Sequence, residues 1–365
     1  MSRSLRAALV AALALAAIVL ASCGGKGSAG TTASLSPDPR VAAAQRFLTR
    51  YVTPDGRVSR IDQGGDTVGE GQAYGMLMAA AIGDQKRFDA IWDWTKANLR
   101  RPDGLIAFLW RNGKVVDSDA ASDADLDATR ALLAASCRFD RPDLKRQALG
   151  LARSILRLET VTTQPGTVVL VAGQWARKPP ITINPSYFSP ATFAALFALT
   201  RDVRWGTLAG TSRTTTAELT RGSSRLPPDW AQLRGGKPVP TGPPGTNSPP
   251  EFTFDAPRTL IRMAEDPNPA GRRLAARAWR VFERQDPRGI AIEHSLSGKQ
   301  IGGTRHPMVL VAAAAAASAA GDTAARDRLL DAAAAQDARR PTYYGAAWVA
   351  LGRIMLTAKF LDACS

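Results

Sequence analysis

The sequence predicts an all-α protein in which an inner ring of about six parallel helices lies within an outer ring of about six. Two observations lead to this prediction. Beyond Pro39, apolar residues recur at three- and four-residue spacing through about twelve segments joined mostly by short loops. Successive segments also alternate between apolar throughout and amphipathic, as buried helices and their covering helices do. An irregular bundle and a solenoid are the alternatives, and the sequence lacks the repeating period that a solenoid requires.

The expected helices follow one another along the chain with little between them. They span residues 39–51, 69–83, 86–99, 123–139, 142–158, 189–200, 203–219, 255–265, 268–284, 306–320, 322–334 and 342–360. The segments expected inside are apolar and rich in small residues, namely 73–82, 131–135, 191–199, 307–320 and 346–356. The segments 86–99, 142–158 and 268–284 are amphipathic and charged, so they are expected in the outer ring.

Two segments depart from the helical pattern. Residues 166–184 contain the runs Thr-Val-Val-Leu-Val and Ile-Thr-Ile, whose β-branched residues predict a small β excursion. Residues 222–252 are rich in Pro, Gly and Ser and are expected to form one long loop. Because no linker divides residues 40–365, they are expected to form a single domain.

The first residues are expected to direct export and anchoring. A short basic segment precedes an apolar run over residues 7–20, and the Leu-Ala-Ser-Cys-Gly that follows resembles a bacterial lipobox. We therefore expect a signal peptide over residues 1–22, a lipid on Cys23 and a flexible tether over residues 23–39. An ordinary signal peptide with an incidental cysteine is the alternative. Gly24, in place of an Asp after the cysteine, favours the outer membrane, facing the periplasm.

Composition excludes several classes of protein. Three cysteines and two histidines exclude a disulfide scaffold and offer no ligand set spaced for zinc, so no metal or cofactor is expected. Cys137 lies in an apolar helical stretch and is interpreted as a buried free thiol, although an oxidising compartment would permit a bridge to Cys364. The net charge is +15, but the basic residues are scattered, so nucleic acid is not an expected partner. Attraction to an anionic surface or an acidic polysaccharide remains open.

Parallel inner helices would bring their N-termini to one mouth. The polar and aromatic residues at those N-termini are Glu70, Asp123, Asn184, Ser186, Tyr187, Asp255, Arg305, His306, Tyr343 and Tyr344. Two or three carboxylates with aromatic surroundings are what cleavage of a glycosidic bond requires.

Three short segments contain these carboxylates. Residues 69–76 read Gly-Glu-Gly-Gln-Ala-Tyr-Gly-Met, and their glycines lack the spacing of a nucleotide-binding loop. Residues 121–127 read Ala-Ser-Asp-Ala-Asp-Leu-Asp, and residues 252–258 read Phe-Thr-Phe-Asp-Ala-Pro-Arg. Taken singly, the last two are explained by acids that cap a helix or pair with an arginine three residues on.

Taken together, the segments resemble glycoside hydrolase family 8, the bacterial endoglucanase family. The Glu-Gly-Gln-x-Tyr-Gly-Met and Ala-Ser-Asp-x-Asp-Leu-Asp patterns are the most specific, and the motifs at 184–187, 226–230 and 254–258 occur in the family's order. The likeness is close over residues 55–265 and rests on helical pattern elsewhere. Ala128 and Thr129 depart from the family's bulkier apolar residue followed by alanine, which concerns packing more than chemistry.

The resemblance implies an (α/α)6 barrel and hydrolysis of a β-1,4-glucan with inversion of configuration. It implies that Glu70 is the general acid, Asp255 the general base and Asp123 the carboxylate that grips the sugar at the cleavage subsite. A helix N-terminus suits the charged forms of the two aspartates. Glu70 must instead be protonated, so we expect burial against Tyr74 and the charge of Asp123 to raise its pKa.

Sugar rings present apolar faces, so a binding cleft needs exposed aromatic side chains. The candidate substrate-binding residues are Tyr74, Trp110, Tyr187, Trp230, Arg258, Tyr343 and Tyr344. Four tryptophans within helical stretches are expected in the core instead, namely Trp92, Trp94, Trp279 and Trp348. His306 is expected to be an ordinary hydrogen-bonded histidine at the mouth.

The expected function is that of a lipid-anchored, monomeric endo-β-1,4-glucanase. It resembles the cellulases that accompany bacterial cellulose synthesis, so the synthesis machinery is a candidate partner beside the β-glucan itself. A polysaccharide lyase on a similar helical toroid is one alternative. A non-catalytic glycan-binding lipoprotein is another, against which the presence of all three acids argues. The sequence does not separate cellulose, mixed-linkage glucan and xylan as substrates.

Overall fold

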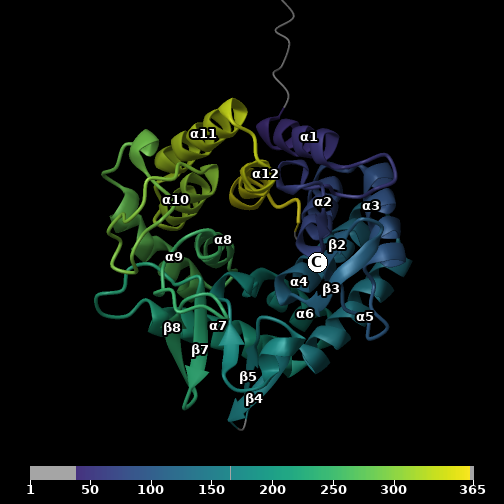
Figure 1. Cartoon of the computed structure of the whole chain (residues 1–365), viewed down its shortest axis with the longest axis horizontal. Coiled ribbons are helices and arrows are strands. Elements are labelled where there is room, and N and C mark those ends of the chain that lie inside the picture. The colour runs from purple at the N-terminus through teal and green to yellow at the C-terminus, as the bar shows by residue number, and fades with distance from the viewer. Residues whose placement is uncertain (1–37, 165, 362–365) are drawn as a thin grey trace, which may run out of the picture. The chain divides into compact units, whose positions relative to one another are not determined.

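The helices alternate between an inner and an outer ring in this computed structural model, which describes residues 38–164 and 166–361 (Figure 1). The inner helices are α2 (Gly69–Ile82), α4 (Ser122–Arg138), α6 (Pro190–Thr200), α8 (Pro257–Ala264), α10 (Pro307–Ala319) and α12 (Tyr343–Thr357). The outer helices are α1 (Pro39–Tyr51), α3 (Gln85–Asn98), α5 (Pro142–Leu158), α7 (Val203–Leu219), α9 (Pro269–Phe282) and α11 (Thr323–Arg339). Contacts between neighbouring inner helices run from α2 through α4, α6, α8, α10 and α12 back to α2. The expected (α/α)6 barrel is confirmed.

Burial separates the two rings as the apolar pattern predicts. Helix α10 is buried continuously over residues 307–317, whereas α9 buries only four residues, which recur at three- to four-residue spacing. Small side chains let inner helices approach closely, since a Cβ added to Gly352 of α12 would lie 2.2 Å from Val311 of α10. Helix α6 is the exception among the inner helices, because it leaves Phe197 exposed.

The helix boundaries differ from expectation mainly at three places. Helix α8 begins at Pro257, two residues later than expected, because proline favours the first helical position. Helix α11 continues to Arg339, beyond the expected end at residue 334, because no helix breaker occurs before Pro341. Helix α12 ends at Thr357 and not at residue 360.

Three small sheets accompany the barrel. They are formed by β1 (Thr67–Val68), β2 (Ala107–Arg111) and β3 (Lys114–Ala120); by β4 (Thr160–Gln164) and β5 (Thr167–Leu170); and by β6 (Ile181–Ile183), β7 (Trp230–Arg234) and β8 (Lys237–Thr241). The β excursion is confirmed in β5 and β6, although these strands belong to different sheets. Short 3-10 helices cover Ile61–Gln63, Gln174–Arg177, Pro185–Tyr187 and Pro287–Gly289.

The expectation of one long loop over residues 222–252 is wrong, because this segment contains the β7–β8 hairpin. Its turn residues Gly235 and Gly236 have φ values of +56° and +77°, and glycine adopts such angles readily. The β2–β3 hairpin turns similarly at Asn112 and Gly113, with φ values of +51° and +82°. An Asn-Gly pair between β-forming runs is the standard signal for such a turn, and here it marks a hairpin that helical periodicity could not reveal.

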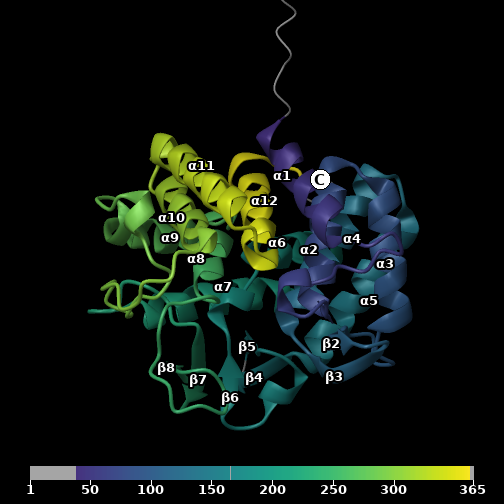
Figure 2. The same cartoon turned by 45° about the horizontal axis from the view of Figure 1, so that its top comes forward.

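The hairpins gather at one end of the helices (Figure 2). This is the end at which the inner helices begin, because β1 leads directly into α2 and β3 into α4, while β6 leads into the 3-10 helix Pro185–Tyr187 that precedes α6. The sheets therefore form walls around the shared mouth of the inner helices.

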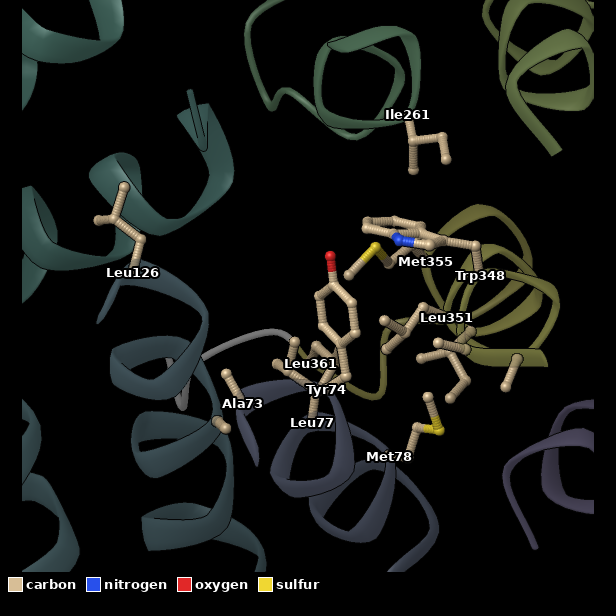
Figure 3. Close-up of a cluster of buried hydrophobic side chains, with 14 of the residues drawn as sticks. Ala73, Tyr74, Leu77, Met78, Leu126, Ile261, Trp348, Leu351, Met355 and Leu361 are labelled. Atoms are coloured by element: carbon tan, nitrogen blue, oxygen red, sulfur yellow. The ribbon is translucent and has the colours of Figure 1, made fainter. Parts of the chain in front are cut away.

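The barrel interior is filled by side chains from several inner helices (Figure 3). Tyr74 of α2 packs edge-on against Trp348 of α12, with ring centroids 5.3 Å apart. Trp92, Trp94 and Trp348 are buried and Trp279 packs partly buried against the core, as expected. Tyr74 thus belongs to the core through its ring, while its hydroxyl reaches the site described below.

Of the three cysteines, only Cys137 lies within the described residues. The interpretation of Cys137 as a free thiol is wrong, because Cys137 is disulfide-bonded. Cys23 and Cys364, the signal peptide and nearly all of the tether lie outside the described residues. Within residues 38–164 and 166–361, no helix is both long and apolar enough to cross a membrane.

Candidate active site

A cavity of about 490 Å³ lies at the mouth where the inner helices begin. Its wall includes six residues expected at the site from the sequence, namely Glu70, Tyr187, Asp255, Arg258, His306 and Tyr344. It also includes residues that the sequence did not single out, namely Arg60, Asp62, Gln63, Val68, Phe108, Phe254 and Thr342. Residues as far apart in sequence as Arg60 and Tyr344 therefore meet in one cavity, as parallel inner helices require.

One guanidinium group connects all three expected acids. Arg258 Nη1 donates to Asp123 Oδ2 at 2.6 Å and to Glu70 Oε2 at 3.0 Å. Arg258 Nη2 donates to Asp255 Oδ1 at 2.6 Å. The Tyr74 hydroxyl lies 3.2 Å from Nη1, so it lies beside Glu70. Because Glu70 and Asp255 bind different nitrogens of Arg258, the guanidinium separates the two carboxyl groups.

The electrostatic surroundings of Glu70 favour its protonated form. Burial raises the pKa of Glu70 from 4.5 to about 7, and the negative charges of Asp123 and Asp255 add to the rise while Arg258 opposes it. The side chain is still 21% exposed, so its carboxyl group can meet a molecule in the cavity. Glu70 can therefore donate a proton near neutral pH.

Asp255 is held at both carboxylate oxygens. Oδ1 accepts from Arg258, and Oδ2 accepts from Asn184 Nδ2 at 3.1 Å. The Asn184 amide is itself fixed, because its Oδ1 accepts from the backbone N–H and the hydroxyl of Ser186. Asp255 lies just before α8 and remains 30% exposed. It therefore presents an oriented carboxylate to the cavity.

The acids of the segment 121–127 have three different environments. Asp123 reaches Arg258, and Asp127, one turn later, binds Arg262 through both carboxylate oxygens at 2.7 and 2.6 Å. Asp125 lies on the opposite face of α4 and accepts from the backbone N–H of Ile106 at 3.0 Å. Only Asp123 belongs to the acid cluster around Arg258.

Three ion pairs in register join α4 to α8 and the residue after it. They are Asp123–Arg258, Asp127–Arg262 and Arg130–Glu265, and each partner lies 135 residues further along the chain. A constant offset in sequence means that the two helices run in the same direction, as the expected parallel inner ring requires. The same register places Arg258 of α8 directly beside Asp123 of α4.

The aromatic residues divide between wall and core. Tyr187 and Tyr344 line the cavity, and the Arg258 guanidinium lies 5.2 Å from the Tyr187 ring centroid. Trp230 packs edge-on behind Tyr187, with ring centroids 6.1 Å apart, and does not line the cavity. Phe108 and Phe254, which are 40% and 43% exposed, provide apolar surface at the cavity instead.

Two further candidate platforms lie outside the cavity wall. Tyr343 is only 1% exposed, and a Cβ added to Gly71 would lie 2.6 Å from its hydroxyl, so Tyr343 supports α2 from behind. Trp110 of β2 packs edge-on against Trp94 at 5.4 Å, outside the cavity wall. Regular alternation would place Phe108 and Trp110, two residues apart, on the same face of β2. The pairing of β2 with β3 shifts register between Leu109 and Trp110, which breaks the alternation, and only Phe108 lines the cavity.

His306 takes a structural position. Its Nδ1 accepts from the backbone N–H of Met308 at 3.2 Å, and so caps α10. Burial lowers the pKa of His306 to about 4, so the ring is neutral at neutral pH. It packs between Phe254 and Tyr344. These contacts agree with the expected ordinary hydrogen-bonded histidine.

The described residues contain no cluster of three or more His, Cys, Asp or Glu side chains that could hold a metal ion. The arrangement instead offers a protonated carboxyl group and an oriented carboxylate in a partly aromatic cavity, with a third, buried carboxylate on the same guanidinium nitrogen as the first. Such a set can donate a proton to one side of a bond and accept a proton from water on the other.

The chain is similar in sequence to known glycan-cleaving enzymes. It matches the family model described as glycosyl hydrolases family 8 over residues 15–357. The probable endoglucanase of Novacetimonas hansenii is 34% identical over 256 residues, which cover 67% of this chain and 73% of that protein. The endoglucanase of Cellulomonas uda is 31% identical over 256 residues, covering 67% and 68%.

Solved structures show the same architecture. The endo-beta-1,4-glucanase of Acetobacter xylinum aligns with a TM-score of 0.74 at 28% identity, covering 88% of this chain and 98% of that chain. The family 8 endoglucanase of Klebsiella pneumoniae aligns with a TM-score of 0.72 at 25% identity, covering 86% and 98%.

Proposed function

Because this chain belongs to glycosyl hydrolase family 8, we propose that it is an endo-acting β-1,4-glucanase that cleaves its substrate with inversion of configuration. The observation that supports this most directly is the cluster of Glu70, Asp123 and Asp255 around Arg258 at the cavity. A glycosidase needs one protonated and one charged carboxyl group, and the raised pKa of Glu70 beside the oriented Asp255 meets that need.

In the proposed reaction, Glu70 donates its proton to the glycosidic oxygen as the bond from that oxygen to the anomeric carbon breaks. Asp255 accepts a proton from the water whose oxygen forms the new bond to the anomeric carbon. Inversion requires room for that water between the two groups, and their binding to different nitrogens of Arg258 supports this proposal. Asp123 is buried outside the cavity wall, where it holds Arg258, and its negative charge favours the protonated form of Glu70.

The cavity wall supports the choice of a sugar polymer as substrate. Phe108, Phe254, Tyr187 and Tyr344 offer aromatic surface, and apolar sugar faces pack on such rings. We propose β-1,4-glucan among the possible polymers, because the relatives named above are endoglucanases. Purified residues 40–365 incubated with soluble cellulose derivatives, mixed-linkage glucan and xylan will rank the substrates. Faster cleavage of xylan would contradict the proposal.

Paired substitutions test the assigned roles. Glu70→Gln cannot donate a proton, so hydrolysis of an unactivated glucan should fall by roughly 10²–10⁴-fold. A substrate with a leaving group that needs no protonation should recover much of this loss. Asp255→Asn should be equally harmful with both substrates, because the water loses its base in either case.

The stereochemistry of the product gives an independent test. Proton NMR of the first product should show the inverted α anomer. A retained β anomer would imply a carboxylate nucleophile and would refute the mechanism. Unsaturated, ultraviolet-absorbing chain ends would indicate a lyase.

We propose that the reaction needs no metal ion, since proton transfer between carboxyl groups and water is sufficient. Dialysis against a chelator should leave kcat/KM unchanged. A loss of activity that one divalent ion restores would contradict this.

We also propose that a lipid on Cys23 anchors the protein to the outer membrane, facing the periplasm, as the lipobox-like sequence indicates. Mass spectrometry of the mature protein should find acyl chains on Cys23, and Cys23→Ser should release a soluble, active enzyme. A mature protein without acyl chains would exclude the anchor.

A further inference from the structure

The segment that contains Asp255 is held by a fourth carboxylate, which does not line the cavity. Asp229 Oδ1 accepts from the backbone N–H of Thr253 at 3.0 Å and from that of Ala256 at 2.7 Å. Its Oδ2 accepts from the Thr253 hydroxyl. Asp229 lies just before β7, and its own N–H donates to the Glu251 carbonyl at 2.8 Å. One side chain therefore binds the chain on both sides of Asp255.

No regular secondary structure could hold the N–H groups of this segment in place of Asp229. Residues 253–256 lie between an isolated bridge at Phe252 and the start of α8, so their N–H groups have no helix or strand partners. The carbonyls of the segment have other donors: the Tyr344 hydroxyl donates to Phe254 at 2.9 Å, and the first N–H groups of α8 donate to Asp255 at 3.1 Å and to Ala256 at 2.9 Å. Asp229 therefore supplies the partner for the backbone N–H groups on the two sides of Asp255, while α8 and Tyr344 hold the carbonyls.

We infer that Asp229 is a positioning residue for the reaction, which fixes the backbone on both sides of Asp255 and so aims the Asp255 carboxylate at the attacking water. This inference depends on the proposed role of Asp255 as the base. Asp229 itself is not suited to be that base, because its oxygens are occupied by the protein's own donors and it lies outside the cavity wall.

The electrostatics agree with close coupling between the two carboxylates. Burial and the negative charge of Asp255 raise the pKa of Asp229 to about 6, against the opposing effect of the hydrogen bonds from Thr253 and Ala256. Placing a second carboxylate beside the base has an electrostatic cost, and the three hydrogen bonds to the loop offset it.

The first experiment compares kcat and KM. Asp229→Ala removes all three hydrogen bonds to the loop and should lower kcat roughly 10²-fold, because a misplacement of about 1 Å can cost that much. KM should change less than about threefold, since Asp229 lies outside the cavity wall. Asp322→Ala is the matched control, because Asp322 also accepts a backbone N–H, from Ala325, at the start of α11. It should lower Tm and leave kcat unchanged.

The decisive experiment is a double-mutant cycle with Asp255→Asn. If Asp229 acts through Asp255, the double variant should be no slower than Asp255→Asn alone, within about threefold. If its loss merely loosens the fold, the two reductions in kcat should multiply, and the inference is wrong. Asp229→Asn serves for the same cycle if Asp229→Ala does not fold, because the amide keeps one acceptor oxygen for the loop.

The outcomes separate this inference from the proposed function. Near-normal turnover of Asp255→Asn would refute the role of Asp255 itself. An inactive Asp255→Asn beside fully active Asp229→Ala and Asp229→Asn would leave that role intact and overturn the positioning role of Asp229.

Discussion

Replacing Glu70 by glutamine should increase the stability of the protein at neutral and alkaline pH while removing its activity. The structure raises the pKa of Glu70 from 4.5 to about 7, mainly through burial. Between these pH values the folded state keeps a proton that the unfolded state releases, so the free energy of unfolding falls as the pH rises. Each pKa unit corresponds to about 1.4 kcal/mol, so the full loss above pH 7 is about 3 kcal/mol. Glutamine cannot ionise and avoids this loss.

Thermal unfolding of both proteins between pH 4 and pH 9 measures this effect. The two Tm values should agree near pH 4, and Glu70→Gln should unfold several degrees higher above pH 7. Glu218→Gln, on the exposed face of α7, is the matched control away from the cavity. Parallel pH dependence of Tm in the wild type and Glu70→Gln would refute the reasoning.

The pH dependence of turnover should report the same group. Above pH 7 the kcat/KM of the wild type on a neutral soluble glucan should fall about tenfold per pH unit, because the fraction of protonated Glu70 falls in that proportion. A profile that stays flat from pH 6 to pH 9 would mean that the proton donor is another group.

Three further substitutions test a buried acid, a buried ion pair and a close contact between two inner helices. Glu159→Gln should raise Tm at pH 8 and have little effect near pH 4, because burial and the negative charges of Asp125 and Asp123 raise the pKa of Glu159. A lower Tm at pH 8 would contradict this. Arg262→Met leaves the buried Asp127 without its ion-pair partner, so the free energy of unfolding should fall by about 3–5 kcal/mol in urea titrations. A fall of less than about 1 kcal/mol would show that the ion pair contributes little. Gly352→Ala should destabilise by about 1–3 kcal/mol through overpacking between α12 and α10. The control Gly210→Ala in α7, where an added Cβ meets no atom within 4 Å, should be neutral or stabilising.

The helical part of the fold could be predicted from the sequence because helix periodicity is local. Apolar residues at three- and four-residue spacing located all twelve helices of the described chain, and continuous apolarity separated most inner helices from outer ones. Hairpins such as β2–β3 and β7–β8 were missed, since strand alternation over about five residues is a weak signal beside long helical patterns. Their turn residues, Asn112-Gly113 and Gly235-Gly236, were the available clue.

The candidate site was only partly accessible from sequence. The motifs identified the segments of Glu70, Asp123 and Asp255, but the aromatic wall depended on which face of a strand or helix each ring occupies. Trp110 and Phe108 lie two residues apart on β2, yet only Phe108 lines the cavity. Likewise Tyr344 lines it while the adjacent Tyr343 is buried.

By itself, the sequence determined which residues form helices and which acids stand at helix N-termini, because both depend on neighbours along the chain. Only the tertiary structure decided which of those residues meet. Arg258 is paired with an acid 135 positions away because α4 and α8 run in the same direction at one register, and no local pattern specifies that register. The same holds for Asp229. Its hydrogen bonds to Thr253 and Ala256 form only because the chain folds back on itself between residues 229 and 253. Burial, and with it the raised pKa of Glu70, exists only once these distant segments have packed together.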